Sequence, residues 1–158
     1  MNAEEITDVI IHNKFKPRLW AVCPNVAQQL PWEADVLAVS PGDKIHEAEV
    51  KVCASDLKRD LLKTKWREPK TFFHVENQVH YFWYAVPKEL QGLAIDIAAK
   101  LGAGVLVCEG KTLTEALKPR KFPGPTGQAD AVEKLRVCLY RLAGLRYWCK
   151  RLGTKSAP

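Results

Sequence analysis

The sequence has 158 residues, and no apolar run in it approaches the ~20 residues that a membrane-spanning helix needs. Its five cysteines include no Cys-x-x-Cys pair, which argues against a zinc cluster or thioredoxin-like chemistry. Cysteines that are odd in number and widely spaced are typical of reduced thiols in a cytoplasmic protein. Glu4 and Glu5 stand where a secretory leader carries basic residues, so we expect no signal peptide. These absences predict a soluble cytoplasmic protein with no membrane partner.

Three further absences argue against particular classes of function. The four histidines, at positions 12, 46, 74 and 80, show no metal-ligand spacing. The stretch Gly124-Pro125-Thr126-Gly127 is short and lacks the lysine of a phosphate loop, which disfavours binding of nucleoside triphosphates. Cys53 has no His–acid pair that would make it a nucleophile, so we expect it in the core.

The composition that remains is that of one globular domain with an uneven distribution of charge. Hydrophobic residues make up 47% of the chain and charged residues 27%, which is enough to bury a core. The net charge of +6 divides into −2 for residues 1–117 and +8 for residues 118–158. We therefore predict a core domain over 1–117, a Pro/Gly-rich linker over 118–128 and a basic C-terminal helix over 129–158. The basic extension suits phosphate contacts, although solubility or an acidic protein partner would also explain it.

Hydrophobic periodicity predicts an α/β fold. Strands alternate with a helix after residue 79, which indicates a layered sheet with a right-handed parallel crossover. The aromatic run Tyr81–Tyr84 resembles a nucleic-acid platform, but consecutive strand residues face both ways, so we expect a central strand buried on both sides. The predicted strands cover residues 18–22, 34–40, 45–52, 79–86 and 105–108, and the predicted helices 3–12, 55–66, 87–101 and 129–152.

One strand carries a polar face that the fold does not require. Side chains alternate along a strand, so Glu47, Glu49 and Lys51 project from the same face. If the turn at 41–43 pairs Ser40 with Lys44, then Asp35 lies directly across from Glu49. A slip of one residue would turn Asp35 to the opposite face. The expected polar cluster therefore depends on the register of this hairpin.

Two carboxylates held close together repel each other unless a cation lies between them or one of them takes up a proton. Oxygen ligands of this kind suit Mg²⁺ or Mn²⁺, which can lower the pKa of a bound water. Lys51 beside them could orient that water or stabilise phosphate charge. The alternative is an exposed strand face with cross-strand Glu–Lys ion pairs, which contribute only ~0.2–1 kcal/mol each.

The surroundings of these residues resemble the PD-(D/E)XK nuclease superfamily and, within it, the MmcB-like DNA-repair proteins. The resemblance extends from the first predicted helix to Cys108. It rests on Ala34-Asp35-Val36-Leu37-Ala38, Glu49-Val50-Lys51, Ser55-Asp56, Asp60, Lys65-Trp66 and Trp83-Tyr84-Ala85-Val86-Pro87.

This resemblance implies a restriction-endonuclease-like α-β-β-β-α-β core with a mixed central sheet flanked by helices. It implies that Asp35 and Glu49 bind Mg²⁺ or Mn²⁺, that Lys51 is the catalytic lysine, and that Glu5 is the extra acid many members carry on the first helix. The dipole at the N-terminus of that helix is the other explanation for Glu5. The chain departs from the family pattern in having Ala34 before Asp35, and Val50 and Val52 on either side of the lysine.

The helix expected after Lys51 is rich in basic residues, which would contact DNA phosphates next to the site. The alternative is a solvated helix face whose acids supply local ion pairs. Trp66 near its end would stack on a base or, more typically, pack on the core. The five basic residues are Lys58, Arg59, Lys63, Lys65 and Arg67.

The leading hypothesis is therefore a Mg²⁺- or Mn²⁺-dependent hydrolase of DNA phosphodiesters, acting on single-stranded, duplex or branched DNA. A second hypothesis is a nucleic-acid-binding or partner-binding protein on the same fold with little or no catalysis. A third is a structural protein that tolerates the polar cluster. A homodimer is compatible with all three.

Overall fold

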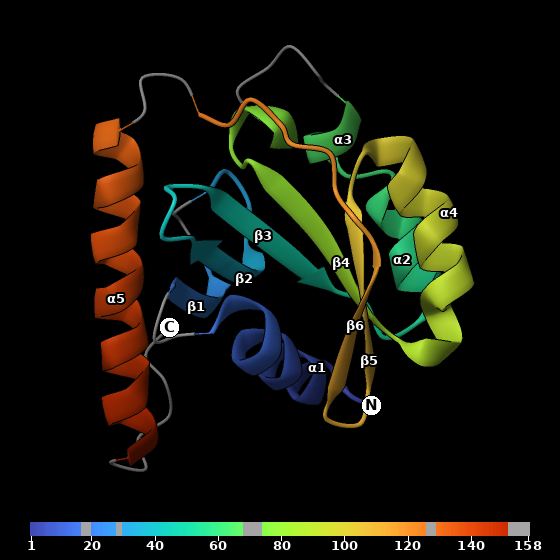
Figure 1. Cartoon of the computed structure of the whole chain (residues 1–158), viewed down its shortest axis with the longest axis horizontal. Helices are drawn as coiled ribbons and strands as arrows, with labels where there is room; N and C mark the ends of the chain where they lie inside the picture. The colour runs from blue at the N-terminus through green and yellow to red at the C-terminus, as the bar shows by residue number, and fades with distance from the viewer. Residues whose placement is uncertain (17–19, 28–29, 68–73, 126–128, 152–158) are drawn as a thin grey trace.

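The structure, a computed structural model of the whole chain, describes residues 1–16, 20–27, 30–67, 74–125 and 129–151, without the side chains of 129–131, 134 and 145–151 (Figure 1). In this part of the chain, no helix is long and apolar enough to cross a membrane.

The centre of the fold is one six-stranded mixed sheet in the order β1-β2-β3-β4-β5-β6. The pairs β1–β2, β2–β3 and β5–β6 are antiparallel, whereas β3–β4 and β4–β5 are parallel. This arrangement confirms the predicted α/β class with a mixed central sheet flanked by helices. The strands are β1 (Ala21–Val26), β2 (Ala34–Val39), β3 (Ile45–Val50), β4 (Tyr81–Pro87), β5 (Gly104–Glu109) and β6 (Thr112–Leu117).

Helices cover both faces of the sheet (Figure 1). Ile6, Val9 and Ile10 of α1 pack into a core on one face, while buried residues of α2, α4 and α5 pack into a larger core on the other. The helices are α1 (Ala3–Ile10), α2 (Ala54–Asp60), α3 (Thr64–Arg67), α4 (Gln91–Leu101) and α5 (Ala129–Arg151), with short helical turns η1 (Ile11–Phe15), η2 (Val75–Asn77) and η3 (Lys88–Leu90).

The prediction that β4 is a central strand is confirmed, because every residue from Phe82 to Pro87 is buried. Close packing against β5 requires a glycine there. A Cβ on Gly104 would lie 2.5 Å from Cε3 of Trp83, closer than any side-chain atom can approach without a shift.

The register of the β2–β3 hairpin is also as predicted. Val39 pairs with Ile45 and Val36 with Ala48, and the Ser40 N–H donates to the Lys44 carbonyl at 2.9 Å. Asp43 in the turn adopts a positive φ of 57°, which a short polar side chain tolerates. Continued by one residue, this register places Asp35 opposite Glu49.

Two local predictions are wrong, and one strand was not predicted. The helix expected over 55–66 ends at Asp60 and resumes as α3, joined by a turn in which Leu62 N–H donates to the Arg59 carbonyl. Cys53 is exposed rather than in the core. The strand β6 was not predicted, because its side chains are mostly exposed and lack the apolar alternation of a half-buried strand.

The first strand, expected over 18–22, is observed over 21–26, and residues 18–19 lie outside the described residues.

The segment expected to be a linker is bound to the core domain as far as it is described. The N–H groups of Arg120, Phe122 and Gly124 donate to carbonyls of Gly102, His80 and Glu76 at 2.8–3.0 Å, and the Phe122 side chain is buried. Residues 126–128 lie outside the described part of the chain.

The C-terminal helix also belongs to the body of the protein. Buried Val132 and Leu139 of α5 join the larger core, and α5 lies beside the β1 edge of the sheet (Figure 1). Arg136 donates to the Ser40 carbonyl at 3.1 Å. Residues 152–158 of the predicted basic helix lie outside the described residues.

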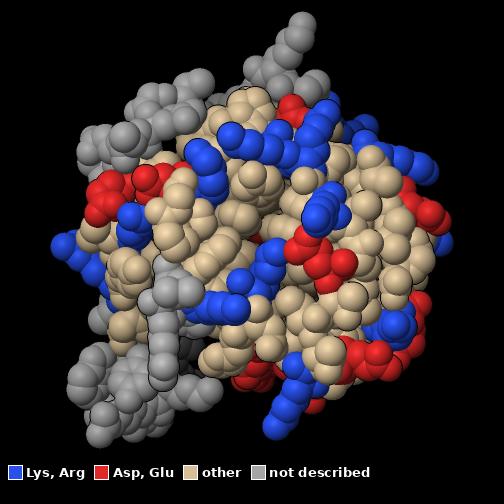
Figure 2. Space-filling view, viewed as in Figure 1, with Lys and Arg blue, Asp and Glu red and all other residues tan. Residues whose placement is uncertain are grey.

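Exposed basic residues are not confined to α5. Lys118, Arg120 and Lys121 are exposed on the segment that runs from β6 towards α5. Figure 2 shows Lys and Arg side chains along the upper part of this face, where that segment runs in Figure 1, with acidic side chains near them.

Candidate active site

The structure brings the three predicted catalytic residues together where β2 begins and β3 ends. The Val50 N–H donates to Asp35 Oδ2 at 2.7 Å, which orients the Asp35 carboxylate. Lys51 Nζ lies 2.9 Å from Glu49 Oε1. The Lys51 N–H donates to the Ala85 carbonyl at 2.9 Å, so the backbone holding this lysine is fixed by the parallel neighbour β4.

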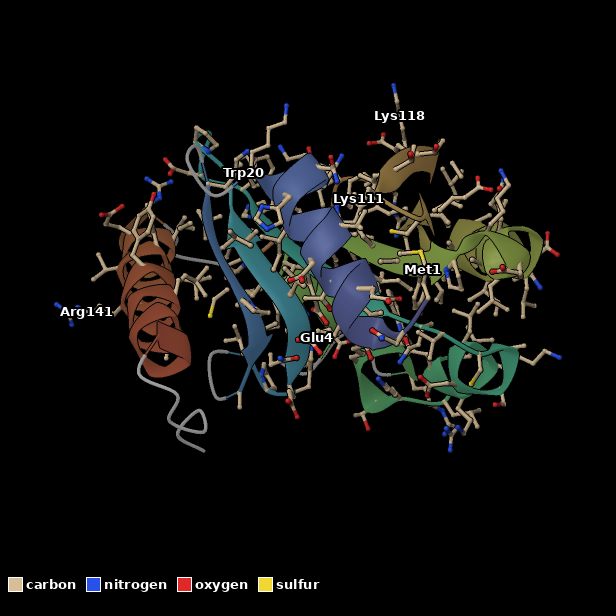
Figure 3. The ribbon with its side chains drawn as sticks, turned by 90° about the horizontal axis from the view of Figure 1, so that it is seen from below. Met1, Glu4, Trp20, Lys111, Lys118 and Arg141 are labelled. Carbon is tan, nitrogen blue, oxygen red and sulfur yellow. The ribbon has the colours of Figure 1, made fainter. Side chains whose placement is uncertain are left out.

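Asp35, Glu49 and Lys51 line a pocket of about 620 Å³, which we call the acidic pocket. Helix α1 contributes Glu4 and Asp8, and α2 contributes Asp56. Figure 3 shows Glu4 at the N-terminal turn of α1, near other polar side chains. The pocket is therefore lined by five acidic side chains and one lysine, the others being Ala3, Thr7, Pro24, Asn25, Val50 and Val52.

Glu5 is not among the residues that line this pocket. Its carboxylate accepts the Asn2 N–H at 2.9 Å, and the Asn2 side chain accepts the Glu5 N–H at 2.9 Å, which forms a capping box at the start of α1. The structure thus places Glu5 in helix capping and brings Glu4 and Asp8 to the pocket instead. Their four-residue spacing puts them on one helix face, a signal that the sequence contains.

A network of buried charges lies behind Glu49. Lys65 Nζ is 3.0 Å from both Glu47 Oε1 and Glu49 Oε2, and its side chain is only 3% exposed. Lys63 Nζ is 2.5 Å from Glu49 Oε1 and 2.6 Å from Asp60 Oδ1. Lys51 Nζ also lies 3.4 Å from Asp60 Oδ1. Three lysines thus neutralise three acids that the sheet and helices remove from water.

Neutral donors complete the network. Tyr84 donates its hydroxyl proton to Asp60 Oδ2 at 2.7 Å, and the Trp66 indole N–H donates to the same oxygen at 3.2 Å. The Trp32 indole N–H donates to Glu47 Oε1 at 2.9 Å. Trp66 lies edge-on to Phe82 with ring centroids 4.8 Å apart, which confirms its packing on the core.

Burial and neighbouring charges move the pKa values of these acids in different directions. Burial raises the pKa of Asp35, and the nearby Glu49 charge raises it further. Burial raises the pKa of Glu47 to about 7 despite the opposing charge of Lys65. Burial acts in the same sense on Glu49 and Asp60, but Lys65 and the other lysines outweigh it and hold both pKa values below their usual range. Burial therefore disfavours the charged form of Asp35, whereas neighbouring lysines stabilise the charged form of Glu49.

The five basic residues expected to contact phosphate fall into two groups. Lys58, Arg59 and Arg67 are exposed, and Lys63 has a half-exposed side chain. Lys65 is buried in ion pairs with Glu47 and Glu49, so the expectation that it reaches a phosphate is corrected. The break between α2 and α3 allows Lys65 to turn inward, where an uninterrupted helix was expected.

The burial of Asp60 and Glu47 was not predicted from the sequence. Glu47 shares its strand face with Glu49, and that alternation is visible in the sequence. Lys63 stands only three residues after Asp60, but the hydroxyl donor Tyr84 belongs to β4, so the burial of Asp60 depends on a contact between distant segments.

The donor set of the acidic pocket fits a hard divalent cation. Its side chains offer carboxylate oxygens, and Mg²⁺ commonly binds through one or two carboxylates while keeping several waters. Asp35 and Glu49 are the two that the local backbone brings to the same place. Among the described residues, no group of three or more His, Cys, Asp and Glu side chains forms a ready metal cage.

Comparisons with known proteins show a likeness in structure. No family model matches the chain, and no curated protein matches it. The solved structure of the SPO1766 protein of unknown function from Silicibacter pomeroyi superposes with a TM-score of 0.67, covering 96% of this chain and 92% of that chain at 14% identity. The two chains share a fold. At this identity the likeness extends to the fold alone.

Proposed function

We propose that the protein is a Mg²⁺- or Mn²⁺-dependent hydrolase of DNA phosphodiesters of the PD-(D/E)XK type. The observation that carries the proposal is the meeting of Asp35, Glu49 and Lys51 at one pocket, with Lys51 Nζ 2.9 Å from Glu49. The order of elements supports it: a helix, three antiparallel strands, a helical crossover and a parallel strand follow one another as the resemblance implies.

The charge of the acidic pocket favours a cation-dependent reaction. Lysines offset the charges of Glu49 and Asp56, but Glu4, Asp8 and Asp35 would still repel a DNA phosphate unless a cation neutralised them. Asp35 and Glu49 would hold that ion. Once bound, a divalent ion supplies charge neutralisation at the phosphate and a lower pKa for a bound water.

The protein's own residues would position the reacting groups. The Val50 N–H fixes the Asp35 carboxylate, and the buried Lys65 fixes Glu49. Lys51 carries an ammonium that can donate a hydrogen bond to the attacking water or to a phosphate oxygen, where it stabilises the charge that develops. Lys58, Arg59 and Arg67, exposed on α2 and α3, would contact the DNA backbone on either side.

The test is cleavage of single-stranded, duplex and branched DNA with Mg²⁺ or Mn²⁺ by the wild type and by Asp35→Asn and Lys51→Met. We expect each substitution to lower the rate by about 10²-fold or more, as when a group that stabilises the transition state is removed. The exposed α4 residues provide matched controls in Asp96→Asn and Lys100→Met, which should leave the rate unchanged. Cleavage that survives both site substitutions would overturn this assignment.

A second candidate, a DNA-binding protein without catalysis, is favoured by a specific observation. Glu49 is already neutralised by Lys51, Lys63 and Lys65, so it competes poorly for a metal ion. DNA binding without cleavage, together with no heat of Mn²⁺ binding in calorimetry, would favour this candidate over the hydrolase.

A further inference from the structure

A second pocket lies on the other side of the buried charges. It has a volume of about 720 Å³ and is lined by Pro31, Trp32, Glu33, Leu62, Lys63, Thr64 and Lys65. Glu49 lines the acidic pocket, and Lys63 lines this one. Lys63 Nζ lies 2.5 Å from Glu49 Oε1, and Lys65 Nζ, also at this pocket, lies 3.0 Å from Glu49 Oε2, so these two ion pairs lie between the two pockets.

The second pocket has the walls that a flat ring requires. The Trp32 indole is held in place by its hydrogen bond to Glu47 Oε1 at 2.9 Å, so it offers a preformed stacking surface. Leu62 is 66% exposed, the most of any large apolar side chain among the described residues, and adds a second apolar surface. Pro31 adds a third apolar surface. The volume falls in the range of about 300–1,000 Å³ typical of small-ligand sites.

The charges around the second pocket indicate a neutral ring carried on an anionic chain. The exposed carboxylate of Glu33 would repel a phosphate but can accept a hydrogen bond from an exocyclic amino group. Lys63, with a side chain 44% exposed, stands at the boundary with the acidic pocket, where the backbone of a bound strand would pass. A nucleobase joined to its phosphate has this combination of properties.

We propose that the second pocket binds an unpaired nucleobase next to the phosphate held at Asp35, Glu49 and Lys51. The proposal rests on the proposed function and names its substrate class: DNA with unpaired nucleotides at the cleaved bond, such as single strands, gaps or flaps. A base within continuous duplex is stacked on both sides and must leave the stack to enter such a pocket. Stacking on an aromatic side chain strengthens binding by about 5- to 150-fold per base.

Binding without metal tests the pocket separately from catalysis. A fluorescently labelled single-stranded oligonucleotide is titrated in EDTA with the wild type, Trp32→Leu and Leu62→Ser. We expect Trp32→Leu to weaken binding about tenfold and Leu62→Ser to weaken it severalfold. Trp32→Phe should retain most of the affinity, because it keeps a ring but loses the indole N–H. Val137→Ser, at an exposed apolar position on α5, is the matched control and should bind as the wild type does.

An oligonucleotide with one abasic position, moved along the strand, completes the test. At one position, the abasic site should weaken binding to the wild type by the same factor as Trp32→Leu weakens binding of the intact strand. Binding of Trp32→Leu should be no weaker for that abasic strand than for the intact strand. Equal binding of abasic and intact strands, or equal losses for single-stranded and duplex DNA, would overturn the proposal. If the variants and the abasic strands bind more weakly as expected but the protein cleaves no DNA, the hydrolase is refuted and the nucleobase pocket stands. If the Trp32 and Leu62 variants bind and cleave DNA as the wild type does, the nucleobase pocket is refuted and the hydrolase stands.

Discussion

Replacing Lys65 with methionine tests whether the buried charges form one interdependent unit. Lys65 Nζ contacts Glu47 and Glu49 at 3.0 Å each and lies 4.5 Å from the centroid of the Phe82 ring. Methionine keeps most of the apolar contact and removes the ammonium group, with its charge and the hydrogen bonds that it donates. It leaves Glu47, which has no exposed surface, with the Trp32 N–H as its hydrogen-bond donor.

Removing one partner of a buried ion pair costs about 3–5 kcal/mol, because the other charge stays buried without compensation. A domain of this size loses roughly 2–4 °C in Tm for each kcal/mol, so we expect Tm to fall by about 6–20 °C. The cost should be smaller at low pH, because Glu47 can then take up a proton instead of remaining charged. Its pKa of about 7 in the wild type already shows how costly that charge is.

The assay is urea unfolding followed by circular dichroism, above and below the Glu47 pKa of about 7. Lys58→Met, at an exposed lysine of α2, is the control and should change stability by no more than about 0.5 kcal/mol. Adding Glu47→Gln to Lys65→Met should recover part of the loss, because it removes the uncompensated charge. A loss below about 1 kcal/mol above that pKa, or the same loss at both pH values, would contradict the reasoning.

Three further predictions follow from particular contacts. Burial holds the pKa of Glu47 in the folded protein at about 7, above the 4.5 of an ordinary glutamate, so the free energy of unfolding should fall as pH rises from 4.5 to 7. Glu47→Gln should flatten this decline, and an unchanged slope in the variant would contradict the assignment to Glu47. Lys63→Met removes a cation that competes for the pocket carboxylates and should tighten Mn²⁺ binding up to about fivefold in calorimetry; unchanged or weaker binding would speak against this competition. Gly104→Ala should cost roughly 1–3 kcal/mol in thermal unfolding because its Cβ meets Trp83, whereas Gly92→Ala, with no heavy atom within 4 Å, should not destabilise; equal effects would refute the packing argument.

Several features of the fold could be predicted because they depend on neighbouring residues. Strands β2 and β3 follow from side-chain alternation, and the residues of the turn between them determine the register. Local information of this kind is enough to place Asp35 opposite Glu49. The burial of β4 follows from its aromatic and β-branched residues, which a strand covered on both faces requires.

Other features depend on contacts between distant segments and left no local signal. The edge strand β6 exists because it pairs with β5, although its own residues are mostly exposed. The segment 118–125 has the prolines and glycines of a linker, yet its backbone is bound to three separate parts of the core domain. The composition of a segment does not indicate which distant carbonyl groups will accept hydrogen bonds from its backbone N–H groups.

For the candidate site, the sequence alone determined the strand face that carries Glu47, Glu49 and Lys51, because alternation along a strand is a local property. Only the tertiary structure decided what surrounds that face. Lys65 was expected to contact phosphate, but in the structure it is buried and forms ion pairs with Glu47 and Glu49. A positive charge stabilises these two carboxylates where water is excluded. The capping box of Glu5 is local, since Asn2 stands three residues before it, but the packing of α1 on the sheet decided that Glu4 and Asp8 line the pocket.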